Sequence, residues 1–507
     1  MDHPKWLEDA VFYEIYPQSF KDTDADGIGN INGITEKLGY IKALGCNAIW
    51  INPCFVSPFM DAGYDVTDYY TVAPRYGTNE DLVNLFAAAH ELDMHVLLDL
   101  VPGHTSTECK WFLESAKAEK NEYTDRYVWT DSVWEGYGSC LRGISDRDGS
   151  CMLNFFSNQP ALNYGFYKVD RPWQQPTDAP GPRATVEELK NIMRFWLTAG
   201  CDGFRVDMAM SLVKNDDPDK FGTMALWQGV REFVSREFPN AALVSEWGDP
   251  GKAINGGFHM DFLLHAGPSH YMDLFRVEEP YFSRRAKGDL TEFIAYYKEN
   301  FASTFGKGLI CIPSGNHDMD RLRRHFDIDE LRVVFAFLLS MPGAPFIYYG
   351  DEIAMRYLEG LVSVEGGYNR TGARSPMQWD SGVNAGFGNS SPEKLYIRLD
   401  ESNDRPTAEA AMKDEGSLWN EIKGLIALRR SEPALGNYSS IEFINEGYPL
   451  VYDRTDGKDT VRVILNPSGQ SVKVEADGKI IYTVGGKARC ENGVCTADAG
   501  TVVFIKR

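Results

Sequence analysis

The sequence has 507 residues, a length that as a prior predicts two to four domains rather than one. Hydrophobic residues make up 43% and charged residues 24% of the chain, values that exclude wholesale disorder. Its 51 Lys and Arg residues against 73 Asp and Glu residues give a net charge of −22, which argues against a nucleic-acid partner and against docking on anionic lipid, because both need clustered cations.

Short apolar segments recur along the first two thirds of the chain and predict buried strands. Their apolar character is nearly continuous, with little alternation, which is typical of a strand covered on both faces. The predicted strands are Val11–Tyr16, Ala48–Asn52, His95–Val101, Gly203–Val206, Leu243–Ser245, Met260–Leu264, Leu309–Pro313 and Phe346–Tyr349.

Helical patterns lie between these strands. The segment Asn79–Leu92 follows Thr78, a favourable N-cap residue, and places its apolar side chains on one stripe. The segment Val186–Thr198 repeats the pattern. Strand and helix alternating eight times predict an α/β fold, the (β/α)8 or TIM barrel, with a doubly wound open sheet as the alternative.

Two stretches depart from this alternation and predict separate units. The connection between the third and fourth strands is long and rich in Trp, Tyr, Gly and Pro, which is typical of a functional or domain-sized insertion. We therefore predict a barrel from residues 1–104 and 175–435, an inserted loop-rich domain at 105–174 and a C-terminal domain at 436–507. Strict alternation in the last segment predicts an antiparallel β-sandwich with strands at Leu450–Arg454, Thr460–Leu465, Lys479–Val484 and Thr501–Ile505.

Acidic residues gather at the predicted carboxyl ends of the barrel strands. Asp99 lies near the end of the third strand, and three more acids, Asp207, Glu246 and Asp318, follow the fourth, fifth and seventh. A barrel places its active site at this end of its strands. Each acid by itself has a structural interpretation as a buried salt bridge or a loop cap, but four of them at one mouth favour a catalytic site.

An acidic loop follows the first strand. Oxygen-bearing side chains alternate along Asp22–Asn30, with Gly27 for the turn, which is typical of a hard-cation site. Gly33 stands where an EF-hand has its bidentate Glu, so the loop is not an EF-hand. A solvated acidic turn is the alternative. We expect a structural Ca²⁺ or Mg²⁺, with ligands at Asp22, Asp24, Asp26, Ile28 and Asn30, and no organic cofactor.

The N-terminal segment and the cysteines favour a cytoplasmic protein. The segment Met1–Asp9 contains three acids and a proline, where a signal peptide needs a basic start and an apolar stretch. Of the nine cysteines, only Cys490 and Cys495 are close enough in sequence to suggest a disulfide, and we expect free thiols.

Four motifs at the strand ends resemble those of the α-amylase family of glycoside hydrolases (family 13), and the resemblance covers nearly the whole chain. The motifs are Asp99–His104, Gly203–Asp207, Ser245–Trp247 and Asn316–Asp318. One position departs from the family, because Gly103 stands where the family usually has an Asn that helps to bind an ion in calcium-dependent amylases. We therefore do not expect that second ion site.

Further segments are similar to the oligo-1,6-glucosidase and α-glucosidase branch of the family. In that branch the positions of Asp61 and Arg370 pair and close the pocket behind the non-reducing sugar, which implies an exo-acting enzyme. The counterpart of the acidic loop holds a cation there. The segments that carry this resemblance are Asp61–Asp65, Gln159–Asn163 and Arg374–Trp379, together with the acidic loop.

The resemblance also implies roles for individual residues. Asp207 is the expected nucleophile, Glu246 the expected acid and base, and Asp318 the third carboxylate, which holds the ring hydroxyls. Arg205 lies two residues before Asp207 on the same strand face, so it is placed to keep that carboxylate ionised. If the reaction retains configuration, as in the family, the two catalytic carboxyls are about 5–5.5 Å apart. The other expected substrate-binding residues are Tyr64 as a stacking platform and His104 and His317 as hydroxyl donors.

The sequence thus predicts a retaining, exo-acting α-glucosidase for short oligosaccharides, as a monomer or homodimer without nucleic-acid or membrane partners. A glucosyltransferase or isomerase similar to trehalose synthase is the alternative, because such enzymes share the Arg374–Trp379 segment. Met208 after the nucleophile matches neither the Val of α-1,6 enzymes nor the Ala or Thr of α-1,4 enzymes, so the linkage stays open. Non-catalytic transporter-associated relatives lose acids, whereas this chain keeps all three.

Overall fold

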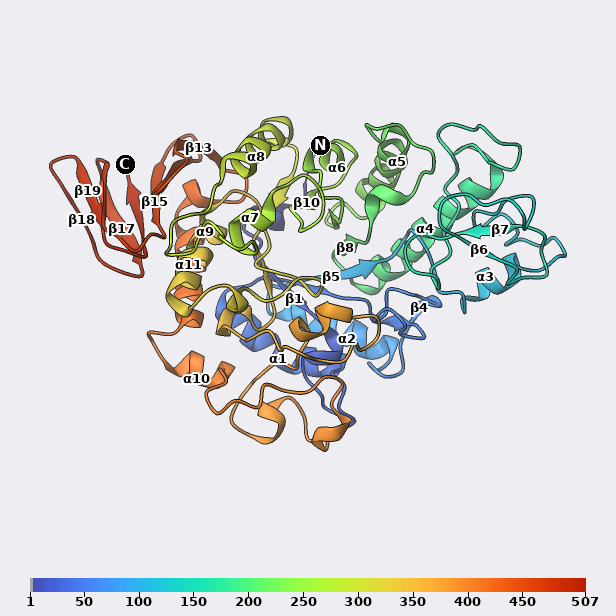
Figure 1. Ribbon diagram of the computed structural model, residues 1–507, viewed down its shortest axis with the longest axis horizontal. Coiled ribbons are helices and arrows are strands. Elements are labelled where there is room, and N and C mark those ends of the chain that lie inside the picture. The colour runs from blue at the N-terminus through green and yellow to red at the C-terminus, as the bar shows by residue number, and fades with distance from the viewer. Residues whose placement is uncertain (1–2) are drawn as a thin grey trace.

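Eight parallel strands form a closed barrel in the computed structural model, which describes residues 3–507 (Figure 1). The hydrogen-bonded order is β11-β10-β9-β8-β5-β2-β1-β12, and a parallel bridge between Pro313 and Phe346 joins the two outer strands. All eight predicted strands are confirmed. Met1 and Asp2, which belong to the N-terminal segment Met1–Asp9 and to the predicted barrel range 1–104, lie outside the described residues. The strands are β1 (Phe12–Ile15), β2 (Ala48–Ile51), β5 (His95–Leu100), β8 (Gly203–Val206), β9 (Ala242–Ser245), β10 (Met260–Phe262), β11 (Leu309–Cys311) and β12 (Phe346–Tyr348).

Both predicted helices are present, and their ends have identifiable causes. The helix α2 (Asn79–Glu91) begins after Thr78, which forms a capping box with Asp81. The helix α4 (Pro180–Ala199) begins earlier than predicted, because Pro180 and Pro182 lie in its first turn, where a missing N–H costs little. The other helices are α1 (Ile31–Leu44), α3 (Lys110–Ser115), α5 (Phe221–Glu237), α6 (Pro250–Asn255), α7 (Tyr271–Phe275), α8 (Thr291–Thr304), α9 (Ile328–Ser340), α10 (Ala408–Lys413) and α11 (Leu418–Ser431).

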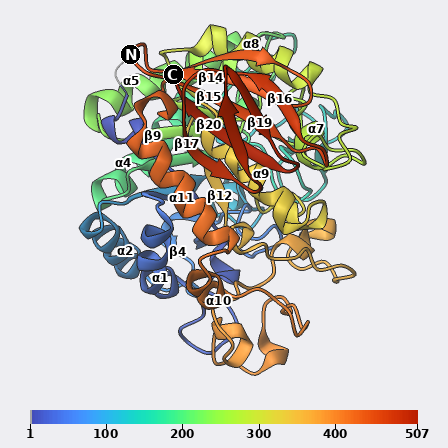
Figure 2. The ribbon, with the colours of Figure 1, turned by 90° about the vertical axis from the view of Figure 1, so that its left-hand side faces the viewer.

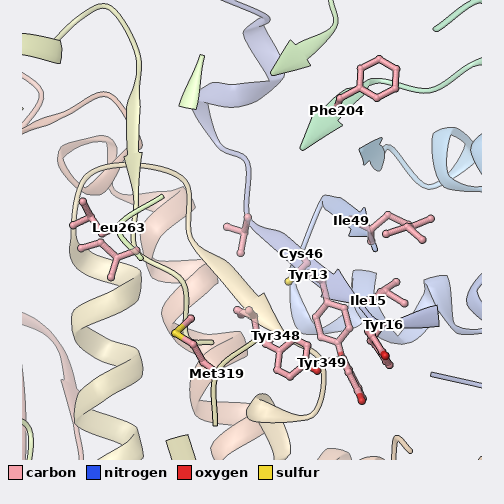
Figure 3. Packing of buried hydrophobic residues seen from close by; sticks show 14 of the residues in the cluster. Tyr13, Ile15, Tyr16, Cys46, Ile49, Phe204, Leu263, Met319, Tyr348 and Tyr349 are labelled. Atoms are coloured by element: carbon pink, nitrogen blue, oxygen red, sulfur yellow. The ribbon is translucent and has the colours of Figure 1, made fainter. Parts of the chain in front are cut away.

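Alternate strand residues divide the barrel into an inner and an outer apolar layer. Phe12 and Leu97 belong to the cluster that fills the barrel. Tyr13 and Ile49 belong to the larger cluster between the strands and the helices, part of which Figure 3 shows. Since side chains alternate along a strand, the residue two positions after each inner residue also points inward. Polar side chains therefore occupy the barrel interior near its carboxyl end.

The inserted segment and a small hairpin cover one side of this mouth. The segment 105–174 contains α3 and a two-stranded sheet, β6 (Cys140–Arg142) and β7 (Ser150–Met152), and is otherwise loop (Figure 1). A backbone bridge between His104 and Ala161 ties it to the end of β5. The hairpin of β3 (Phe55–Val56) and β4 (Asp68–Val72) follows β2. The domain boundaries, which stay predictions, all fall between secondary-structure elements.

The C-terminal residues form two antiparallel sheets at the opposite end of the molecule from the inserted segment (Figures 1 and 2). The four predicted strands are confirmed, and Ile464 and Val503 pack with Ala497 in an apolar cluster between the sheets. Four strands escaped the sequence analysis because they are short or largely exposed. One sheet contains β13 (Ser440–Asn445), β14 (Leu450–Thr455), β15 (Thr460–Asn466), β17 (Lys479–Val484) and β20 (Thr501–Lys506), and the other β16 (Val472–Glu475), β18 (Ala488–Glu491) and β19 (Val494–Ala497).

All nine cysteines are free, and Cys490 and Cys495 lie opposite each other on β18 and β19.

Within residues 3–507, none of the helices has both the length and the apolar character that a bilayer crossing requires.

Candidate active site

The four predicted acids meet at the carboxyl end of the barrel. Asp99 lies in β5, Asp207 and Glu246 follow β8 and β9 directly, and Asp318 lies in the loop after β11. Arg205 contacts the first three acids, and His317 contacts the fourth. All four acids therefore lie near the carboxyl ends of their strands or in the loops that follow them.

Arg205 joins three carboxylates in a site that water hardly reaches. Its Nη1 lies 2.9 Å from Asp99 Oδ1 and 3.2 Å from Asp207 Oδ1, and its Nη2 lies 2.8 Å from Glu246 Oε2. The Arg205 side chain is 2% exposed. Because one cation does not neutralise three buried carboxylates, ionising all of them is costly.

The pKa values of the carboxyls around Arg205 reflect the shortage of positive charge there. Burial raises the pKa of Asp207 well above its ordinary value, and the neighbouring Glu246 carboxyl raises it further, against the effect of Arg205. Burial also raises the pKa of Asp99 to about 6, although Arg205 lowers it. Both carboxyls contact the Arg205 guanidinium, so they lie close together. Two neighbouring buried carboxyls beside one cation favour a state with one proton between them, which supplies both an acid and a carboxylate.

The backbone after Asp207 also contacts the second carboxyl. Met208 has φ 41° and ψ 44°, a left-handed conformation that is strained for a residue with a side chain. In this conformation its N–H donates to Glu246 Oε2 at 3.0 Å. The strained residue therefore fixes the separation of the two catalytic candidates.

Asp318 has the opposite electrostatic environment. Its Oδ1 accepts hydrogen bonds from Arg370 Nη1 at 2.6 Å and from Arg374 Nη2 at 3.0 Å. Burial opposes ionisation of Asp318, but the contact with His317 and the charges of Arg370 and Arg374 outweigh it and hold the pKa of Asp318 far below its ordinary value. This carboxylate stays ionised and can hold hydroxyl groups.

Asp61 and Arg370 meet as predicted, but at the limit of an ion pair. Arg370 Nη2 lies 3.8 Å from Asp61 Oδ1, farther than the same side chain lies from Asp318. Asp61 Oδ2 instead accepts a hydrogen bond from Gln159 at 2.8 Å. Burial raises the pKa of Asp61 to about 6, against Gln159 and Arg370. Arg370 thus links Asp61 to Asp318.

Tyr64 and His317 form a stacked pair. Their ring centroids are 5.2 Å apart with 12° between the planes, and the Tyr64 hydroxyl donates to Asp99 Oδ2 at 3.0 Å. Tyr64 is therefore oriented by Asp99 and lies beside the site, as a stacking platform requires.

His104 differs from the expectation of a free hydroxyl donor. Its Nε2 donates to the Tyr64 carbonyl at 3.0 Å, and its Nδ1 accepts from Asn154 Nδ2 at 3.1 Å. Burial lowers the pKa of His104 to about 4, so it is neutral. A Cβ at Gly103 would lie 2.6 Å from that Asn154 amide. The departure at Gly103 thus makes room for Asn154, and both His104 nitrogens are occupied.

The acidic loop is held by its own hydrogen bonds. Asp22 accepts backbone hydrogen bonds from Asp24, Ala25 and Gly27, and Asn30 caps α1 through Gly33. Within residues 3–507, no three His, Cys, Asp or Glu side chains gather as a possible metal site. The predicted ligand set also includes Ile28 and Asn30, and the cation stays a prediction.

Four residues of the site were missed as functional candidates. Gln159 and Arg374 lie within motifs that the sequence analysis recognised, yet their partners Asp61 and Asp318 are distant in sequence. Glu14 and Asn52 contact His317 from β1 and from the end of β2. Glu14 lies two residues after Phe12 on the inward face, which was a signal that could have identified it.

Comparisons with known proteins agree with this geometry. A family model described as alpha amylase, catalytic domain, matches residues 14–437. The chain is 30% identical to "Trehalose synthase/amylase TreS" of Mycobacterium tuberculosis over 94% of this chain and 84% of that protein. It is 29% identical to an oligo-1,6-glucosidase of Parageobacillus thermoglucosidasius over 94% and 93% of the two chains. A mutant of trehalulose synthase MutB has a similar structure, with a TM-score of 0.83, 25% identity and 99% of each chain covered.

Proposed function

The chain belongs to the α-amylase family of glycoside hydrolases, and we propose that within this family it is a retaining, exo-acting α-glucosidase. Its proposed substrates are short oligosaccharides, from which it removes the terminal α-linked glucose. The observation that carries the proposal is the bridge that Arg370 makes between Asp61 and Asp318, which would close one end of the site. A cleft open at this end would suit attack within a long chain instead.

The chemistry follows from the two sides of the site. Glu246 protonates the glycosidic oxygen while Asp207 attacks the anomeric carbon, which gives a covalent glucosyl ester and frees the rest of the oligosaccharide. Glu246 then takes a proton from water, which attacks the same carbon and releases α-glucose and the Asp207 carboxylate. The contacts of both carboxyls with the one Arg205 guanidinium support retention, because they hold the pair close together, whereas an inverting pair is separated by about 6.5–9.5 Å to admit a water. Asp318 holds the ring hydroxyls.

A panel of di- and trisaccharides that differ in linkage tests the retaining mechanism. Proton NMR during the first turnovers is expected to show α-glucose before mutarotation, and initial β-glucose would refute retention. The panel also ranks the α-1,4 and α-1,6 linkages.

The exo claim has a separate test. Asp61→Ala removes the carboxylate that closes the pocket and is expected to lower kcat/KM for disaccharides about 10- to 100-fold, the effect of losing hydrogen bonds to a charged group. A maltooligosaccharide with a bulky acetal on its non-reducing end is the control, and the wild-type enzyme should leave it intact. Cleavage of the blocked substrate by the wild type, or an unchanged rate in the variant, would contradict the exo assignment.

A glucosyltransferase or isomerase is the second candidate, favoured by similarity to a trehalose synthase/amylase and to a trehalulose synthase. Both reactions would use the same glucosyl ester on Asp207 and differ only in whether water or a sugar hydroxyl accepts the glucose. Product analysis with maltose and with sucrose separates them. Free glucose as the main product supports hydrolysis, whereas trehalose or a sucrose isomer supports transfer.

The structural cation is a proposal of its own, supported by the alternation of oxygen-bearing residues in Asp22–Asn30. Binding would require Asp24 and Asp26, which are exposed, to turn toward Asp22. Thermal unfolding in Ca²⁺ and in chelator tests it, since a bound ion raises the free energy of unfolding by about 2.7 kcal/mol at a concentration of 100 Kd. The cytoplasmic location and the monomeric or dimeric state also stay predictions.

A further inference from the structure

A further carboxyl, that of Glu14 on β1, lies behind the site and has no role in the chemistry above. Glu14 is 0% exposed, and it lies on the inward face of the barrel two residues after Phe12. Burying a carboxyl among apolar residues is costly unless specific partners hold it. Its contacts therefore indicate what it does.

The partners of Glu14 converge on the His317 ring. Glu14 Oε1 lies 2.9 Å from His317 Nδ1, and it also accepts from Asn52 Nδ2 at 3.3 Å and from the His317 backbone N–H at 3.4 Å. Glu14 Oε2 is buried without a hydrogen-bond partner among the described residues. All of the hydrogen bonding of this carboxyl is thus directed at His317 and at Asn52, which itself lies 3.1 Å from His317 Nδ1.

Stacking alone leaves the direction of the His317 ring open. The ring lies nearly parallel to Tyr64, at 12°, and to Tyr16, at 16°. Parallel rings define a plane, but they do not define which edge of the imidazole faces Asp318. The bond from Nδ1 to Glu14 defines that edge, and it leaves His317 Nε2 at 3.2 Å from Asp318 Oδ2.

The Glu14 contact also determines which nitrogen carries a hydrogen toward the pocket. One proton lies between Glu14 Oε1 and His317 Nδ1, and burial, which raises the pKa of Glu14 and lowers that of His317, favours its residence on the carboxyl. Nε2 lies 3.2 Å from Asp318 Oδ2, and because an ionised carboxylate can only accept, the contact requires a hydrogen on Nε2. That hydrogen faces Asp318 and the sugar that Asp318 is proposed to hold.

We propose that Glu14 is a positioning residue, which holds the His317 ring with its Nε2–H directed at Asp318 and at the adjacent sugar hydroxyl. The assignment deepens the proposed function and rests on it for the identity of the sugar. The arrangement of Glu14, His317 and Asp318 does not depend on the substrate.

Two substitutions at Glu14 and one matched control test the assignment. Glu14→Leu removes the hydrogen-bonding group, whereas Glu14→Gln keeps an amide that can donate to Nδ1. Glu352 is the control, because it is also 0% exposed, is held by the hydroxyls of Tyr13 and Tyr40, and has a buried Oε2 without a partner among the described residues. Glu352→Gln therefore removes an equally buried carboxyl that does not contact His317.

Kinetics on the best disaccharide give the first readout. Glu14→Leu is expected to lower kcat about 100-fold with a small change in KM, since misplacing a group that acts in the transition state has an effect of this order. Glu14→Gln and Glu352→Gln should stay close to the wild-type rate. A folded Glu14→Leu enzyme with the wild-type kcat, or an equal loss in Glu14→Gln, would overturn the assignment.

Proton NMR gives a readout that does not depend on activity. A proton shared between a buried carboxyl and an imidazole nitrogen is strongly deshielded, so the wild type and Glu352→Gln should show a far-downfield resonance that Glu14→Gln and His317→Asn lack. Persistence of this resonance in Glu14→Gln would contradict the Glu14–His317 bond, even if Glu14→Leu did not fold. If the resonance behaves as expected but no α-glucoside is cleaved, the proposed function fails and the positioning of His317 stands.

Discussion

The two sides of the active site hold their carboxyls in opposite electrostatic environments. On the β8 and β9 side, Asp207 and Glu246 share Arg205 with Asp99, so three acids surround one cation. On the β11 side, Asp318 alone receives hydrogen bonds from Arg370 and Arg374. The pKa of Asp207 is accordingly raised and that of Asp318 is lowered, although both are buried.

This difference matches what each side has to do. A nucleophile and its acid partner need one ionised and one protonated carboxyl side by side, and a single cation among buried carboxyls favours that combination. A carboxylate that only holds hydroxyl groups has to remain ionised at every working pH, which a surplus of cations provides. The count of cations per carboxylate, rather than burial, separates the two roles.

Asp207→Asn, on the β8 and β9 side, is the substitution with the largest expected effect on activity. The amide cannot attack the anomeric carbon, so kcat is expected to fall roughly 10⁴- to 10⁶-fold, the range for removing a nucleophile or its partner. Turnover of the best disaccharide measures it, with the circular dichroism spectrum as a check of folding. Undiminished turnover in the folded variant would exclude Asp207 as the nucleophile.

Arg205→Met tests the charge count through the pH profile. Activity requires ionised Asp207, so kcat/KM rises as the pH increases through its raised pKa, and Arg205 keeps that pKa from rising further. Without the cation, the acid limb of the profile should move to higher pH, with a loss of about 100-fold at neutral pH.

Arg370→Met is the matched control for Arg205→Met. It removes a cation from the other side, where Asp318 keeps Arg374, so it should lower the rate without moving the acid limb. Equal shifts of the limb in both variants would remove the distinction between the two sides.

Stability should respond with opposite signs on the two sides. Asp318→Asn leaves two arginines without their shared carboxylate and is expected to lower the free energy of unfolding by about 2–4 kcal/mol at pH 7. Asp207→Asn removes a carboxylate that is costly to ionise and is expected to raise it by about 1 kcal/mol.

The pH dependence of these two changes follows from the pKa directions. The Asp318 contribution is present above the unfolded pKa of about 4 and disappears as the pH falls through the lowered folded pKa. The Asp207→Asn gain is absent near pH 4, where wild-type Asp207 is protonated in the folded protein, and grows as the pH rises. Denaturant unfolding at about pH 4.5 and about pH 7 measures both changes, and changes of the same sign would contradict the comparison.

Much of the architecture was accessible from the sequence, and the misses have physical causes. Nearly continuous apolar runs identified all eight barrel strands, because a strand buried on both faces has few polar positions. The strands β16 and β18 were missed, since half of their residues are exposed and they resemble turns. The acidic loop has a sequence pattern for a cation, which stays a prediction, and its Asp22 accepts hydrogen bonds from the loop's own amides.

The sequence by itself determined that Asp99, Asp207, Glu246 and Asp318 meet, because the carboxyl ends of parallel barrel strands open onto one mouth. Only the tertiary structure decided which cation pairs with which carboxylate. Arg370 was expected to pair with Asp61 and lies closer to Asp318. Glu14 contacts His317 from a strand about three hundred residues away in the sequence. Such pairings depend on side-chain directions across a closed barrel, and spacing along the chain does not contain that information.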